Sequence, residues 1–97
     1  MKKLAFALQK PMKTIFKYKL ETTGIQTISM PIGAGIVHTA LQGENICIWA
    51  IVNDGNDLEM RIFHIFGTGH PITGGDLKYI STVHVGALVF HIFEENQ

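Results

Sequence analysis

Hydrophobic and polar residues alternate along much of this chain with a period of two. Within residues 15–20, Phe16, Tyr18 and Leu20 fall on one face, and Lys17 and Lys19 fall on the other. Successive side chains of an extended strand point to opposite sides, so this alternation predicts a half-buried β-strand. Runs rich in β-branched and aromatic residues predict further strands at 25–30, 36–42, 46–52, 60–66, 77–85 and 87–93.

Turn-forming residues separate these runs. Residues 43–45 (Gly-Glu-Asn) have the length of a hairpin loop, and residues 53–57 (Asn-Asp-Gly-Asn-Asp) predict a second hairpin between the flanking strands. Gly86 marks a tight bend or bulge between the last two runs. The run at 46–52 is apolar on both faces, which predicts a central strand covered on both sides.

These patterns predict an all-β fold, mainly antiparallel and arranged as a meander. So small a sheet must close into a barrel, fold into a sandwich or pair its edges with another subunit. We therefore expect a small barrel or sandwich of about seven strands, formed by residues 12–97 as a single β domain. Residues 1–11 are expected to be a basic N-terminal arm or extension, either a short helix or disordered.

Composition adds a prediction about partners. The chain has 97 residues, of which 46% are hydrophobic and only 16% charged, which favours a folded domain and a homo-oligomer that covers part of its apolar surface. Net charge is zero, yet six of the eight basic residues precede the first acidic one. These six are lysines without arginine, so they are weak evidence for nucleic-acid binding, and we do not expect a nucleic-acid partner.

The location of the protein follows from what its segments lack. Residues 1–8 resemble a secretory signal, but their apolar run is too short and no cleavage site follows. No stretch approaches the roughly 18 apolar residues of a membrane span. A single cysteine, Cys47, lies between isoleucines and is expected to be buried and unreactive. We therefore expect a cytoplasmic protein that does not bind membranes.

The residue types that carry catalysis or bind metals do not form a recognisable motif. No two of the five histidines have the spacing of metal ligands on one strand or one helix, and neither serine lies in a nucleophile elbow. We expect no catalytic residues, no metal and no cofactor. Four histidines lie in apolar strands, where a core or interface position is expected: His38, His64, His84 and His91. The aromatic residues are expected to fill the core, with a stacking platform for nucleobases as the alternative.

The fifth histidine lies in a glycine-rich loop that follows the run at 60–66. Glycine allows the backbone to approach a ligand closely, and successive free N–H groups can form a nest for an anion. Gly67, Thr68, Gly69 and His70 are therefore the candidate binding residues for a phosphate or carboxylate. The alternative is a rigid structural turn.

Five segments taken together resemble a family of short phage and prophage proteins. They are KTIFKY at 13–18, QTISMPIGA at 26–34, CIWAIV at 47–52, FGTGHPI at 66–72 and GALVFHIFE at 86–94. The resemblance covers residues 13–94, and family members often begin near the position of Met12. It carries no known activity, so it implies a setting and no site residues.

The resulting expectation is a small, oligomeric, non-enzymatic binding protein of phage type. It would sequester a host factor or a small anionic, nucleotide-like ligand, as in counter-defence. Two alternatives remain open from the sequence, namely a structural or assembly protein of the virion and a nucleic-acid-binding accessory protein.

Overall fold

The computed structural model describes residues 10–22 and 24–97. They form β1 (Lys13–Leu20), β2 (Gly24–Pro31), β3 (Gly35–Gln42), β4 (Asn45–Asn53), β5 (Leu58–Gly67), β6 (Leu77–Val85) and β7 (Leu88–Glu95). The predicted all-β fold is confirmed. Of the predicted arm, residues 1–9 lie outside the described part, and Lys10 and Pro11 are exposed and belong to no strand. In the described part, no helix is long and apolar enough to cross a membrane.

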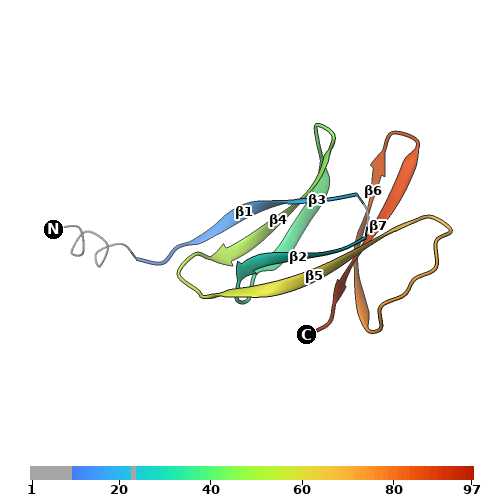
Figure 1. The fold of residues 1–97 in the computed structure, drawn as a ribbon. Helices are drawn as coiled ribbons and strands as arrows, with labels where there is room; N and C mark the ends of the chain where they lie inside the picture. Colours follow the sequence, from blue (N-terminus) through green and yellow to red (C-terminus); the bar gives the residue numbers. More distant parts are fainter. Residues whose placement is uncertain (1–9, 23) are drawn as a thin grey trace.

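The strands form two antiparallel sheets that pack against each other as a sandwich (Figure 1). One sheet has the order β1-β4-β3, and the other has the order β2-β5-β7-β6. The predicted meander is wrong, because only β3–β4 and β6–β7 are both consecutive in sequence and paired. The connections after β1, β2 and β4 each cross to the other sheet, so these consecutive strands do not form a ladder.

The turn at residues 53–57 shows this difference between local and long-range structure. Its position is as predicted, but it joins the two sheets and is not a hairpin, because β4 already has β1 and β3 as neighbours. The turn also holds the start of the domain. The Met12 N–H donates to Asp54 Oδ1 at 2.7 Å, and the Asp54 N–H donates to the Met12 carbonyl at 3.0 Å.

The core lies between the inner faces of the two sheets. Ile46, Ile48 and Val52 alternate inward along β4, and they are completely or almost completely buried. Phe63 from β5 and Ile92 from β7 are completely buried on the opposing side. Full burial of one such side chain contributes roughly 1.5–3 kcal/mol, so this layer is the main source of cohesion between the sheets.

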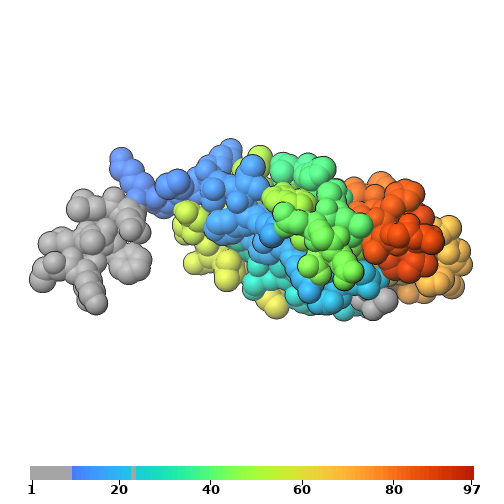
Figure 2. Space-filling model, turned by 90° about the horizontal axis from the view of Figure 1, so that it is seen from above, coloured from blue at the N-terminus to red at the C-terminus, as the bar shows by residue number. Residues whose placement is uncertain are grey.

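The outer face of β4 is not covered, which contradicts the prediction for this strand. Cys47 is buried as predicted, but Trp49 is only half-buried and Ile51 is exposed. The exposed His38 ring lies against Trp49 with the ring centroids 5.6 Å apart, so it is not a core histidine. Figure 2 shows β1 (blue) and the β3–β4 hairpin (green) side by side, next to the β6–β7 hairpin (orange to red).

Candidate functional site

The four residues singled out from the sequence form a tight turn at the end of β5. The His70 N–H donates to the Gly67 carbonyl at 3.1 Å, and Gly69 has φ of +87°, a left-handed conformation that favours glycine. The His70 N–H is therefore used inside the turn and is not part of an anion nest. A ligand at this turn has to be held by side chains and by other backbone groups.

The rest of the loop packs against the outer face of the four-stranded sheet. Gly74 has φ of +112°, and a Cβ atom at this position would lie only 2.6 Å from His64 Cε1. The His64 ring is buried, as predicted, and its Nε2 lies 2.7 Å from Glu95 Oε2. Gly74 is therefore required both for its conformation and for the close approach of the loop to this imidazole.

Aromatic side chains form a floor beside the loop. The Phe93 ring makes edge-to-face contacts with Phe66 and Tyr79, at centroid distances of 5.6 and 5.5 Å. The prediction that these rings fill the core is wrong, since Tyr79 is exposed and the two phenylalanines are only half-buried. The reason is the strand period. Phe63 faces the core, so Phe66, three positions later on the same strand, faces the outer side.

The turn and the floor enclose a cavity of about 270 Å³, which we call the loop pocket. Its lining consists of the four predicted residues together with Phe66, Ile72, His91 and Phe93. From the sequence, Phe66 and Phe93 are expected in the core, with a stacking platform as the alternative, and neither Ile72 nor His91 is assigned to a ligand site. His91 is on β7 and is placed opposite Phe66 only by the pairing of β5 with β7, so no local signal could have identified it.

Hydrogen bonds hold the His91 imidazole on both sides. Its Nε2 lies 2.9 Å from Thr68 Oγ1, and its Nδ1 lies 2.9 Å from Thr82 Oγ1. The chain of contacts continues from Thr82 to the Tyr79 hydroxyl at 2.7 Å. A hydroxyl can donate or accept, so this network suits either tautomer of the ring. The network fixes the orientation of His91 and ties Thr68 of the turn to the sheet.

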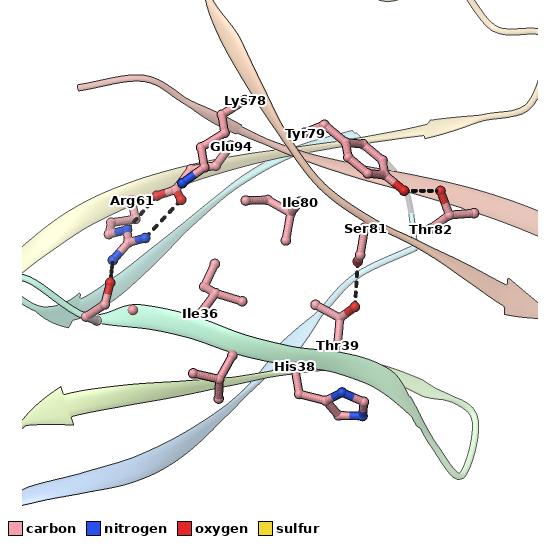
Figure 3. Close-up of a pocket in the computed structure, with 13 residues that line it drawn as sticks. Ile36, His38, Thr39, Arg61, Lys78, Tyr79, Ile80, Ser81, Thr82 and Glu94 are labelled. Atoms are coloured by element: carbon pink, nitrogen blue, oxygen red, sulfur yellow. Dashed lines mark hydrogen bonds and ion pairs between the residues drawn. The ribbon is translucent and has the colours of Figure 1, made fainter.

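A larger cavity of about 590 Å³ lies between β3 and β6, which are edge strands of the two sheets (Figure 3). We call it the edge cleft. At one end, Arg61 donates to both carboxylate oxygens of Glu94, from Nε at 2.5 Å and from Nη2 at 2.9 Å. Its Nη1 donates to the Ala34 carbonyl. The hydrogen bonds to Glu94 raise the pKa of Arg61 above its usual value, against the opposing effect of burial.

The remaining chemistry-bearing residues do not gather into a further site. Within residues 10–22 and 24–97, no group of three or more His, Cys, Asp or Glu side chains is arranged to hold a metal ion. His84, predicted to be a core or interface residue, is exposed on β6. The loop pocket and the edge cleft are two of the places where the described side chains converge on a cavity with polar groups; a third cavity, of about 380 Å³, has Lys13, Asn53 and Asn56 in its lining.

Comparison with known proteins relates the chain to one family. Residues 12–97 match a family described as a domain of unknown function (DUF7352), and this match includes every strand. No curated protein and no solved structure matches the chain. Since the family match covers far more than half of the sequence, the chain belongs to the DUF7352 family.

Proposed function

We propose that this protein is a small, non-enzymatic binding protein that holds a nucleotide-like anion in the loop pocket. The observation that carries the proposal is that residues 67–70 form the wall of a cavity whose floor includes Phe66 and Phe93. Ligand sites are usually concave and largely apolar, with a few polar groups that orient the ligand. The loop pocket has this character, because it combines two aromatic rings with the imidazoles of His70 and His91.

The size of the loop pocket indicates which part of a nucleotide it would take. Its volume of about 270 Å³ is slightly below the range of roughly 300–1,000 Å³ typical of drug-sized ligand sites, so a single planar ring system fits it best. A base that stacks on an aromatic side chain gains roughly 1–3 kcal/mol. The anionic group would lie at the mouth, where the exposed His70 imidazole can donate a hydrogen bond.

Binding is favoured over catalysis by the state of His91. Both of its ring nitrogens lie within hydrogen-bonding distance of threonine hydroxyls, so neither nitrogen is free to take a proton from a bound ligand. The His70 side chain makes no hydrogen bond to the part of the chain that the structure describes, and it lies on the exposed turn. The two imidazoles therefore serve to shape the pocket and to contact an anion.

The biological setting of the proposal comes from the resemblance of the sequence to phage and prophage proteins. In that setting, the protein would act in the host cytoplasm and sequester a host nucleotide signal, as in counter-defence. Its homo-oligomeric form would cover part of the apolar surface that the single chain leaves exposed. Sequestration requires tight binding and no turnover.

The test uses native mass spectrometry of the purified protein and a titration with adenosine 5′-monophosphate followed by amide NMR. We expect a discrete oligomer that carries a small molecule, and shifts confined to residues 66–72 and their neighbours on β7. The variant His70→Ala should weaken binding by about five- to tenfold. His84→Ala removes an exposed imidazole outside the pocket and should leave binding unchanged.

Two results would contradict the proposal. One is a protein that carries no small molecule and shows no amide shifts around the loop pocket at millimolar nucleotide. The other is an equal loss of binding in the His70 and His84 variants, which would show that any imidazole on the surface has the same effect.

A second candidate function, assembly of a virion structure, is favoured by the apolar surface of the sandwich. Exposed aliphatic and methionine side chains occur on strands of both sheets: Ile15, Val37 and Ile51 on one, and Ile25, Leu58 and Met60 on the other. Such surfaces often mark contacts with other protein chains. An assembly protein would form species that grow with concentration in light scattering, whereas the proposed binding protein forms one discrete oligomer.

A further inference from the structure

The edge cleft is separate from the loop pocket and has the dimensions of a ligand site. Its volume of about 590 Å³ falls within the roughly 300–1,000 Å³ typical of small-molecule sites, and the two cavities share no lining residue. Five consecutive residues of β3 and five of β6 line it, at positions 35–39 and 78–82. Both edge strands have a register shift here, between Ile36 and His38 and between Tyr79 and Ser81.

The cleft is held open at both ends by polar contacts between the two sheets. Figure 3 shows the Arg61–Glu94 pair at one end and the Thr39–Ser81 pair at the other, with Ile36 between them. The Arg61 guanidinium bonds the Ala34 carbonyl just before β3, and the Thr39 and Ser81 hydroxyl oxygens lie 2.5 Å apart. These contacts fix the spacing of β3 and β6, so the space between them is largely preformed.

The charges around the cleft favour an anion. A guanidinium has five N–H donors, and three from Arg61 are used in the bonds to Glu94 and Ala34, which leaves two with no bond to residues 10–22 or 24–97. Lys78 lines the same cavity, is exposed, and has no ion pair among the residues that the structure describes. Among the lining residues, the positive charges of Arg61 and Lys78 exceed the single negative charge of Glu94 by one, and the charge of Glu59, outside the lining, also acts on Arg61. Arginine and lysine together are suited to a phosphate group.

The opposite part of the cleft is lined with hydroxyl groups. Thr39 and Ser81 form a pair across the cleft, whereas the Tyr79 and Thr82 hydroxyls bond to each other and, from Thr82, to His91 on the outer face of the sheet. Each hydroxyl has one donor and two acceptor positions, so the single bond between Thr39 and Ser81 leaves capacity on both groups for a ligand hydroxyl. A molecule with a phosphate at one end and several hydroxyls at the other would match both halves of the cavity.

We propose that the edge cleft binds a small phosphorylated polyol, of the sugar-phosphate class, with its phosphate on Lys78 and Arg61 and its hydroxyls on the Thr39–Ser81 side. The burial of Arg61 and Glu94 is consistent with this role. Buried ion pairs often add little net stability compared with an apolar pair of similar size. The pair holds the guanidinium in place, with two donors left for the ligand.

The experiment is an amide NMR titration of the full chain with ribose 5-phosphate, with inorganic phosphate as the second probe. We expect ribose 5-phosphate to shift amides at 35–39 and 78–82 and to bind more tightly than phosphate. Lys78→Gln should weaken binding by about tenfold without changing the thermal midpoint. Lys19→Gln removes the same charge from β1, away from the cleft, and should have no effect.

The outcomes separate this site from the loop pocket and from simple charge attraction. No shift at the two segments, or shifts confined to residues 66–72, would overturn the proposal. Equal weakening by the Lys78 and Lys19 variants would show that binding is non-specific and would overturn it as well. Equal affinity for phosphate and ribose 5-phosphate would refute the role of the hydroxyl groups. A third variant, Ser81→Ala, should weaken the binding of ribose 5-phosphate and leave the binding of phosphate unchanged.

Discussion

Removal of one charge from the Arg61–Glu94 pair is the most informative perturbation of this fold. In Glu94→Gln, the shape of the side chain is kept, but the guanidinium loses its counter-charge and one of its two acceptor oxygens. The side chains of Arg61 and Glu94 are only 11% and 8% exposed, so water in the edge cleft compensates only partly for the lost partner. The variant should therefore be strongly destabilised.

The size of the effect follows from the burial of the pair. Loss of one partner of a buried ion pair costs roughly 3–5 kcal/mol, and we expect about 3 kcal/mol because the glutamine still accepts one hydrogen bond. For a domain of this size, 1 kcal/mol shifts the thermal midpoint by roughly 4–8 °C, so the midpoint should fall by roughly 12–24 °C. Small domains have only about 5–15 kcal/mol of stability, so the variant should fold but with little reserve.

The assay is urea denaturation together with thermal melting, and the next residue in the chain provides the matched control. Glu95 lies on the other face of β7, where its side chain is 36% exposed and its carboxylate pairs with His64. Solvent reaches the Glu95 carboxylate, and glutamine still offers an oxygen to the buried His64 ring, so Glu95→Gln should cost less than about 1 kcal/mol. If Glu94→Gln costs no more than Glu95→Gln, the pair is not buried in solution and the reasoning is refuted.

A double variant separates the charge from the space it occupies. In Arg61→Met with Glu94→Leu, both charges are removed, and much of the lost stability should return because no unpaired charge is left in the core. The Ala34 carbonyl loses its donor, which limits the recovery by roughly 1 kcal/mol. A double variant as unstable as Glu94→Gln would show that packing, and not the uncompensated charge, causes the loss.

Two further predictions concern the loop and the alkaline limit of stability. Gly74→Ala and Gly75→Ala both place a side chain at positive φ, but only at position 74 would the new Cβ collide with His64. Amide hydrogen exchange of the loop should therefore rise more in Gly74→Ala than in Gly75→Ala. Equal rises in the two variants would contradict the packing of the loop on His64. Burial raises the pKa of Tyr18 above its usual value, with the charge of Arg61 opposing it. Because the neutral phenol is favoured in the folded state, the contribution of Tyr18 to the free energy of unfolding is complete below about pH 10 and is lost as the pH rises further. Tyr18→Phe should thus lose less stability than the natural protein between about pH 9 and pH 12 in denaturant titrations, and equal losses would refute the shift.

The pattern along the chain determined the local structure of this protein. The predicted runs and the observed strands differ by at most two residues at either end, because period-two alternation and turn residues act over a few neighbours. The turn at residues 67–70 was singled out for the same reason. Its glycines and the following proline end β5 whatever the rest of the chain does.

Tertiary structure alone decided how the strands pair and which faces are covered. The alternation shows that Phe63 and Phe66 point to opposite sides of β5, but it does not show which side meets the second sheet. Arg61 and Glu94 are distant in sequence, and each would be expected at the surface. The pairing of β5 with β7, together with the packing of β3 on these two strands, brings the two charges together between the sheets. The same pairing places His91 beside the predicted turn. Both candidate sites therefore depend on contacts between segments that are distant in sequence. These contacts are determined by the free energy of the whole sandwich and not by the local pattern of residues.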